Sequence, residues 1–226
     1  MNTLARRSAA ALVLAAAIYV LFVRRRIVRW GATDDELARP YPGADLVPGG
    51  TRASTMAVTI DAPPTEVWPW LIQMGGDRAG WYSWDHLDNG GHSSARQLHP
   101  EWQNLALGDH IAAWSPTGLI ADAWEVVALE PGRFLGLRGR SELRSRTTRS
   151  GSSRPAAYTE GLWGFLLEEV DTGRTRLLVG GYQVMRPRWL ERIVDFWVYP
   201  PVHWVMQARQ LHNLKRNIEG AHASKQ

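Results

Sequence analysis

The sequence predicts an α+β fold in which an antiparallel sheet packs against a long C-terminal helix. Three observations support this prediction: a strand and a helix open the domain, strands joined by short turns follow, and an amphipathic helix closes it. The 226 residues suit one domain with appendages. Because the chain contains no cysteine, disulfides and thiolate chemistry are excluded.

The chain begins with an apolar segment between arginines. Ser8–Val23 carries no charge, and snorkelling of the flanking arginines extends the apolar span to residues 6–26, or about 31 Å of helix. We therefore expect residues 1–29 to form a single-pass membrane anchor with basic flanks. A cleaved signal peptide is the alternative, but RRRIVRW follows the segment where a small-residue cleavage site would stand. The excess of arginine after the segment favours a cytoplasmic domain.

An extended linker, a strand and a helix follow in order. Residues 30–50 are rich in glycine, proline and aspartate, which is typical of an extended connector. Thr51–Asp61 alternates apolar and polar residues and predicts a strand. Pro63 and Pro64 can open a helix but cannot lie inside one, so we expect a helix to begin there.

The second half of the chain predicts a meander of strands and then the closing helix. The expected strands are Asp109–Ser115, Leu119–Leu129, Arg133–Arg138, Ala157–Val170 and Thr175–Met185, with turn residues between them. Residues 140–155 are an Arg/Ser-rich segment that we expect to be a disordered loop. The helix spans Pro187 to about Gly220, and Pro200–Pro201 must kink or split it. Its expected apolar stripe is Leu190, Ile193, Trp197, Trp204, Ala208 and Leu211.

The basic isoelectric point comes from two short segments. Residues 1–30 hold six arginines and no acid, and residues 138–154 hold six arginines and one glutamate. The remainder of the chain is net acidic, whereas a nucleic-acid-binding domain carries its basic residues on the folded surface. We therefore expect no nucleic-acid partner.

Three segments carry a resemblance to a known superfamily. They are VTIDAPPTEVWPWLIQMG, then GWYSWDHLDN followed by LHPEWQNLALGD, and then YPPVHWVMQARQLHNLKRNIEG. Together with the element order, they resemble the START/Bet v 1-like superfamily, also called SRPBCC or the polyketide cyclase/dehydrase and lipid transport superfamily. The resemblance covers residues 51–219, and the segments look like the membrane-associated or uncharacterised bacterial branch.

This resemblance implies a helix-grip domain over residues 51–220, in which a curved antiparallel sheet wraps around the long C-terminal helix. It also implies an apolar ligand held between the sheet and that helix, whereas a minority of members are cyclases, dehydratases or hydroxylase-associated domains. Because the superfamily has no universal catalytic motif, the fold does not specify a reaction.

Aromatic residues are the strongest candidates for a ligand site. The segment GWYSWDHLDNGG lies between the first helix and the sheet, where it can form the rim of a pocket. Trp residues combine a large apolar surface with one N–H group, which suits pocket walls. The candidate ligand-binding residues are Trp81, Tyr82, Trp84, Trp102, Trp124, Trp163 and His203.

Catalytic candidates are few. Asp85, His99 and His203 could act as an acid or base if they face the pocket, although turn hydrogen bonds and buried packing are the simpler alternatives for each. The spacing of His86, His92 and His99 matches no metal motif, and no phosphate loop or nucleophile elbow occurs. We expect neither a metal nor a cofactor.

Three functional hypotheses follow. The first is a membrane-anchored protein that binds an apolar or amphipathic small molecule or lipid, and it requires a cavity between sheet and helix. The second is a cyclase- or dehydratase-like enzyme, which requires a pocket acid or base beside a polar partner. The third is a protein-interaction scaffold, which would show as tryptophans exposed outside the fold.

Overall fold

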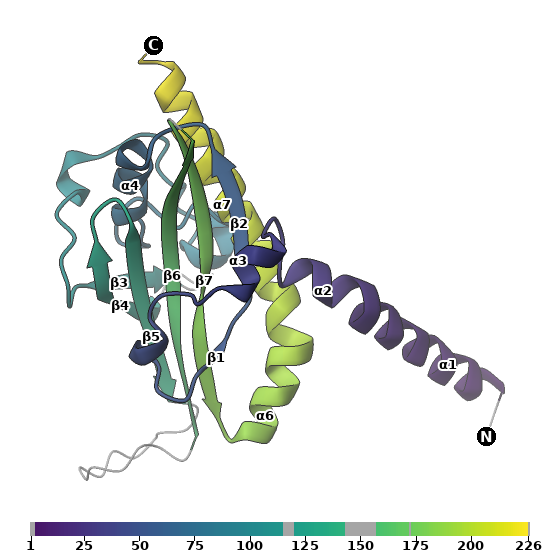
Figure 1. The fold of residues 1–226 in the computed structure, drawn as a ribbon. Helices are drawn as coiled ribbons and strands as arrows, with labels where there is room; N and C mark the ends of the chain where they lie inside the picture. Colours follow the sequence, from purple (N-terminus) through teal and green to yellow (C-terminus); the bar gives the residue numbers. More distant parts are fainter. Residues whose placement is uncertain (1–2, 115–119, 143–156, 172, 226) are drawn as a thin grey trace, which may run out of the picture.

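The computed structural model shows one curved sheet with a long helix across its inner face (Figure 1). It describes residues 3–114, 120–142, 157–171 and 173–225. The expected turn at residues 116–118 and nearly all of the expected Arg/Ser loop at residues 140–155 lie outside the described residues.

All seven strands among the described residues pair antiparallel. The sheet order is β1-β7-β6-β5-β4-β3, and β2 also pairs with β7. The strands are β1 (Thr51–Arg52), β2 (Met56–Ile60), β3 (His110–Trp114), β4 (Ile120–Glu130), β5 (Phe134–Glu142), β6 (Tyr158–Asp171) and β7 (Arg174–Arg186). The predicted meander is confirmed, because β3 to β7 are neighbours in chain order. The first predicted strand is divided in two, and both parts pair along β7.

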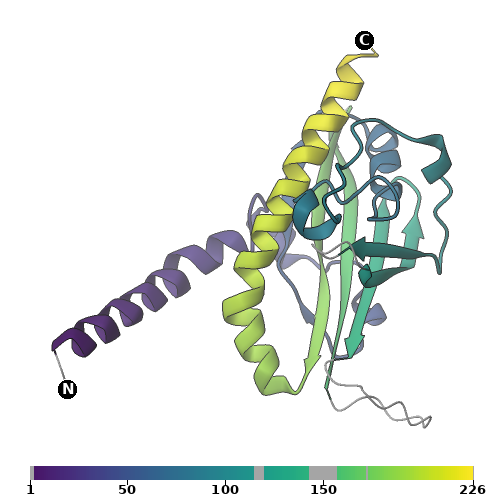
Figure 2. The same cartoon turned by 180° about the vertical axis from the view of Figure 1, so that it is seen from behind.

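The helix predicted after the two prolines is α4 (Pro64–Ile72), with proline at its first position. Its buried face packs under one end of the sheet. The loop after it contains α5 (Asp85–Asp88) and a 3₁₀ turn, η3 (Pro100–Trp102). This loop therefore lies along the inner side of the sheet, next to the C-terminal helix (Figure 2).

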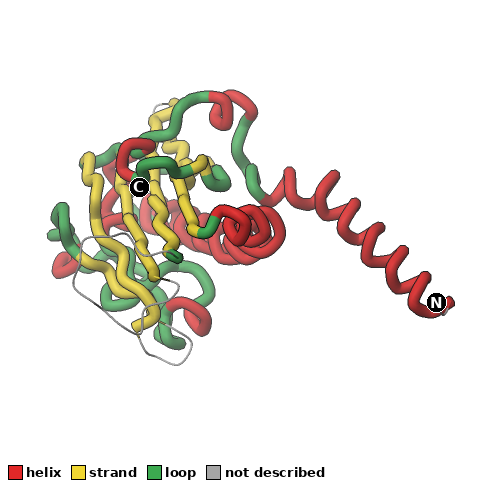
Figure 3. Tube along the Cα trace, turned by 90° about the horizontal axis from the view of Figure 1, so that it is seen from below, coloured by secondary structure: helices red, strands yellow, loops and turns green. Residues whose placement is uncertain are grey.

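The C-terminal helix changes its hydrogen bonding just before the proline pair. It consists of α6 (Arg188–Ile193), a π-helical segment η4 (Val194–Val198) and α7 (Tyr199–Ala223). Proline cannot donate to the preceding turn, so the wider π spacing accommodates Pro200 and Pro201 without ending the helix. Seen along its length, the helix lies beside the strands as a separate layer (Figure 3).

The packed face of this helix differs from the predicted apolar stripe. Leu211 is fully buried as expected, but Ile193 and Trp197 are 51% and 43% exposed. Gln207 and Gln210 are buried instead. An apolar periodicity could not identify this face, because its centre is made of amides that satisfy one another.

Residues 30–50 are not an extended linker but a cover for the outer face of the sheet. They contain α3 (Asp34–Ala38), a 3₁₀ turn η2 (Ala44–Leu46) and the buried side chains of Tyr41 and Val47. The Tyr41 hydroxyl donates to the carbonyl of Gly164 on β6 at 2.8 Å. Both faces of the central strands are therefore buried, which explains why Leu162–Leu167 is apolar without alternation.

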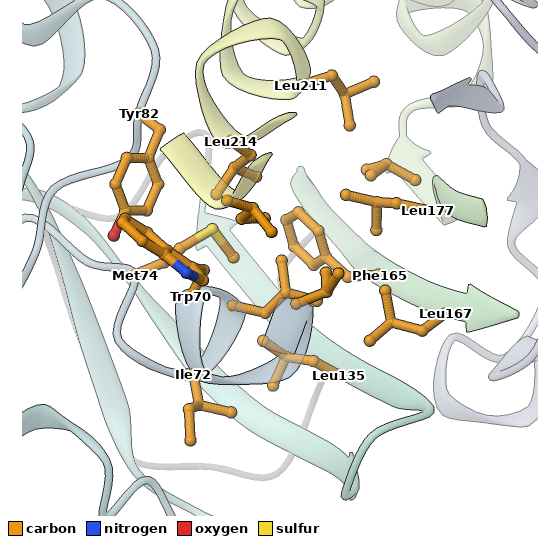
Figure 4. Packing of buried hydrophobic residues seen from close by; sticks show 14 of the residues in the cluster. Trp70, Ile72, Met74, Tyr82, Leu135, Phe165, Leu167, Leu177, Leu211 and Leu214 are labelled. Carbon is orange, nitrogen blue, oxygen red and sulfur yellow. The ribbon is translucent and has the colours of Figure 1, made fainter. Parts of the chain in front are cut away.

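The main core lies between the sheet and the helices α4 and α7. Figure 4 shows Phe165 and Leu135 from the sheet meeting Trp70 from α4 and Leu211 and Leu214 from α7. All five of these side chains are buried. Burial of large side chains at this end of the sheet anchors α7 and fixes its position over the other end.

The predicted membrane-spanning anchor is not supported. The N-terminal helical run consists of α1 (Thr3–Ile18), a π-helical segment η1 (Tyr19–Val23) and α2 (Arg24–Ile27), and it projects from the body (Figure 1). No helix within the described parts of the chain is both long enough and apolar enough to cross a membrane.

Candidate functional site

A pocket of about 400 Å³ lies between the sheet and α7. It exists because the inner face of the sheet changes from large to small side chains along its length. Near α4, this face carries Leu135 and Leu137 on β5 and Phe165 and Leu167 on β6. Further along the same strands, it carries Gly139, Ser141, Thr159 and Gly161. The first group fills the space below the helix, and the second group leaves it open.

Two glycines that face each other form the floor of the pocket. Gly139 on β5 and Gly161 on β6 are directly paired. A Cβ atom on Gly139 would lie 2.9 Å from the ring of Trp124, so this glycine is required for the indole to lie flat on the strand. A Cβ atom on Gly161 would meet nothing closer than 3.5 Å. The space beside the Cα of Gly161 is therefore open, and a larger side chain at this position could fill it.

Three tryptophans form a continuous wall. Trp81 and Trp124 each have a ring centroid 5.3 Å from that of Trp163. The three residues come from the loop after α4, from β4 and from β6, and all of them line the pocket. All three were predicted from the sequence as ligand-binding residues.

A chain of amide hydrogen bonds links the ring of Trp163 to the backbone of Trp81. Trp163 Nε1 donates to Gln207 Oε1 at 2.9 Å, and Gln207 Nε2 donates to Gln210 Oε1 at 2.6 Å. Gln210 Nε2 then donates to the carbonyl of Trp81 at 2.9 Å. The glutamines lie three residues apart on α7, so they share one helix face. The wall is thus held by the helix and not only by packing.

The loop places Trp81 through an unusual backbone conformation at its neighbour. Tyr82 has φ = 58°, a region in which a residue other than glycine costs about 1–2 kcal/mol. Several contacts maintain it: Tyr82 Oη accepts from Gln73 Nε2 at 2.6 Å, and its carbonyl accepts from Asn213 Nδ2 at 2.8 Å. The ring of Tyr82 is only 1% exposed and belongs to the core. Tyr82 therefore supports the pocket but does not line it.

His203 lines the pocket from α7. Its Nδ1 lies 3.0 Å from Ser54 Oγ, and its ring stacks on Tyr199 with centroids 4.9 Å apart. Burial lowers the pKa of His203 to about 4, so the imidazole is neutral at physiological pH. Among the described residues, Nε2 of His203 makes no hydrogen bond.

Asp88 also lines the pocket, although it was not among the residues predicted from the sequence. It ends α5, and burial raises the pKa of its carboxyl to about 6, an effect that the charge of Asp85 reinforces and the hydroxyl of Ser83 partly offsets. Its Oδ1 has no hydrogen-bond partner among the described residues. The sequence offered one indication of this role. Asp88 lies three residues after the candidate Asp85, so the two carboxylates share one side of a helical turn.

Two of the predicted ligand-binding tryptophans lie outside the pocket. Trp84 is 42% exposed, with its ring 4.8 Å from the guanidinium of Arg209 and its Nε1 donating to the carbonyl of Val205 at 3.2 Å. Trp102 packs against the main core, with its ring 4.5 Å from that of His99. Neither lines the pocket of about 400 Å³.

Two of the three catalytic candidates also have structural contacts. Asp85 Oδ1 accepts from the backbone N–H of Ser94 at 3.2 Å and from its hydroxyl at 2.6 Å, which closes the loop. His99 pairs with the exposed Glu101 at 3.2 Å, outside the pocket. Of the three, only His203 faces the cavity. No group of three or more metal-ligating side chains occurs among the described residues.

The sheet, the helix and the pocket between them define an α+β protein that is consistent with a helix-grip arrangement. The pocket volume falls in the range of about 300–1,000 Å³ that is usual for small-molecule sites.

Comparisons with known proteins add little to this description. No family model and no curated protein matches the chain. Among solved structures, the chain is similar to a hypothetical protein from Helicobacter pylori (16% identity, 72% of this chain and 84% of that one, TM-score 0.45). It is also similar to a conserved protein from Geobacillus kaustophilus (14% identity, 74% and 95%, TM-score 0.44) and to the Aha1 dimer from Colwellia psychrerythraea (17% identity, 73% and 94%, TM-score 0.41). These distant likenesses carry no argument about function.

Proposed function

We propose that the protein binds an apolar or amphipathic small molecule, such as a lipid, in the pocket between the sheet and α7. The observation that carries the proposal is a cavity of about 400 Å³ whose wall is formed by Trp81, Trp124 and Trp163. Aromatic rings give large apolar contact areas, and a few polar groups at the same pocket can orient a ligand. The resemblance to the START/Bet v 1-like superfamily supports the same use of this space.

The test combines ligand detection with a variant that fills the pocket. Native mass spectrometry of the full chain, purified in mild detergent and mixed with extracted lipids, should show a bound species. Gly161→Leu places a branched side chain on the open floor and should abolish binding. The structure should tolerate the change, because the new Cβ has no neighbour closer than 3.5 Å.

Gly220→Leu is the matched control. Gly220 lies on the exposed surface of α7, with nothing within 4 Å of a Cβ atom. This variant should bind as the wild type does. If Gly161→Leu binds the ligand as tightly as Gly220→Leu does, the ligand does not bind in the pocket between the sheet and α7, and the proposal is wrong.

A second candidate function is acid–base catalysis on the bound molecule. It is favoured by His203, a neutral imidazole that faces the pocket beside the hydroxyl of Ser54. An imidazole held in this form can accept a proton from a substrate. Incubation of the purified chain with its co-purified ligand, followed by mass analysis of the product, separates turnover from simple binding.

A further inference from the structure

One charged group in the pocket has no counter-ion. Asp88 lines the cavity, and none of the ion pairs between described residues includes it. Burying a carboxylate without a partner costs free energy, which a cation in the pocket would recover. The free pocket therefore has an unmet preference for positive charge.

The aromatic wall has the same preference. Trp81, Trp124 and Trp163 line the cavity together with Asp88. The ring centroids of Trp81 and Trp124 each lie 5.3 Å from that of Trp163. The face of an indole attracts ammonium groups within about 6 Å of its centroid. A carboxylate and several indoles in one pocket are therefore complementary to an ammonium group.

Other groups at the pocket do not reverse this preference. His203 is neutral, and the amides of Gln207 and Gln210 are already used in the chain that fixes the tryptophans. Arg140 also lines the cavity and could attract an anion, but its side chain is exposed. Interactions of exposed charges are weakened by water and salt, whereas the partly desolvated Asp88 is screened less.

We propose that the pocket selects a cationic amphiphile: an amine whose ammonium group binds at Asp88 and the tryptophan wall while its apolar body fills the remaining space. This inference rests on the proposed ligand-binding function and specifies its ligand class. It also predicts pH dependence, because an ammonium binds the ionised form of Asp88. The other titratable groups on α5 and at the pocket are Asp85 and His86 on α5, Tyr199 and His203 on α7, Arg140 on β5 and Tyr182 on β7.

The test compares three probes with one ten-carbon tail: decylamine, 1-decanol and decanoate. Binding to the full chain is measured by titration calorimetry and tryptophan fluorescence at pH 7.5. Decylamine should bind at least about tenfold more tightly than 1-decanol, and decanoate should bind most weakly. Decylamine affinity should fall about tenfold at pH 5, since a carboxyl with a pKa of about 6 is then mostly protonated.

Variants assign these effects to Asp88. Asp88→Asn should remove both the preference for decylamine over 1-decanol and its pH dependence. Asp45→Asn is the matched control, since Asp45 is an exposed carboxylate on η2, and it should behave as the wild type. A pH-dependent preference that survives in Asp88→Asn would assign it to another group, such as His86, and overturn the proposal.

The outcomes separate the two levels of the argument. If 1-decanol or decanoate binds as tightly as decylamine, the pocket binds ligands but does not select amines, and only this inference fails. If none of the three probes binds, both the inference and the proposed function fail. The pH measurement on the wild type needs no variant, so the proposal stays testable even if Asp88→Asn does not fold.

Discussion

At the scale of single residues, one buried ion pair holds the N-terminal cover to the sheet. Arg176 on β7 donates from Nε to Glu36 Oε1 at 2.7 Å and from Nη2 to Oε2 at 3.0 Å. Their side chains are 13% and 11% exposed. Glu36 also completes a capping box with Thr33 at the start of α3. These contacts join the start of α3 to β7, two segments that are distant in sequence.

Glu36→Gln should destabilise the protein by about 2–4 kcal/mol at pH 7, because the guanidinium of Arg176 would remain buried without its counter-ion. The pair with Arg176 lowers the pKa of Glu36. The carboxylate therefore stabilises the fold above its unfolded pKa of about 4.3, and this contribution is lost as the pH falls through the folded pKa. Urea unfolding at pH 7 and pH 3.5 should show a large difference between variant and wild type that shrinks at the lower pH.

The control is Glu130→Gln, which removes a pair with Arg133 in which the side chains are 50% and 65% exposed. Its effect should stay below about 0.5 kcal/mol, as is usual for surface pairs. Equal effects of the two substitutions would show that the cover is not held by its buried pair.

At the scale of elements, the strand pair β5–β6 sets the boundary between core and pocket. Gly139 and Gly161 are partners in this ladder, yet they have different roles. Gly139→Ala should destabilise the protein by about 1–3 kcal/mol. The new Cβ would lie only 2.9 Å from the ring of Trp124, so the ring would have to move. Gly161→Ala should be neutral or stabilise by up to about 1 kcal/mol, since glycine weakens a strand interior.

Thermal unfolding of both alanine variants, with tryptophan fluorescence to detect movement of Trp124, tests this assignment. The two substitutions add the same methyl group to paired positions, so each is the control for the other. If Gly161→Ala destabilised the protein as much as Gly139→Ala, the floor at Gly161 could not be open.

The elements also show how far the sequence could predict the site. The meander and α4 follow from turn residues and periodicity, which act locally, and Trp81, Trp124 and Trp163 were identified by residue type. The sequence could not show that Asp88, and not Asp85, faces the pocket. The distinction depends on a tertiary contact, because the hydroxyl of Ser94 donates a hydrogen bond to Asp85. The outer cover was missed because Tyr41 and Val47 stand among glycines and prolines.

At the scale of the whole molecule, the N-terminal helical run contains two different parts. Leu12 and Val13 on α1 are 71% and 70% exposed, whereas Ile27 at the end of α2 is buried. Tyr19 Oη donates to the carbonyl of Phe196 at 2.8 Å, and the guanidinium of Arg24 lies 4.4 Å from the Phe196 ring centroid. The attachment to the body therefore begins near Tyr19.

A second group of exposed apolar side chains lies on α6, η4 and α7. It consists of Trp189, Ile193, Trp197, Val198, Val202 and Val205. Tyr19 stacks on Trp197 with centroids 5.2 Å apart, so this group adjoins the base of the N-terminal run. Exposed apolar side chains promote association, and exposed tryptophans are the feature expected from the scaffold hypothesis.

These two parts predict different results for two truncations. Removal of residues 1–18 takes away the exposed side chains of Leu12, Val13 and Leu14, so the melting temperature should change by less than about 2 °C while self-association in mild detergent decreases. Removal of residues 1–27 also takes away Ile27, Arg24 and Tyr19 and should lower the melting temperature by at least about 5 °C, because buried contacts with the body are lost. Thermal unfolding and light scattering on the two truncated chains measure both effects. Equal melting temperatures of the two truncated chains would show that α2 contributes nothing to the stability of the folded body. Unchanged self-association after the shorter deletion would assign the association to the exposed apolar side chains on α6, η4 and α7.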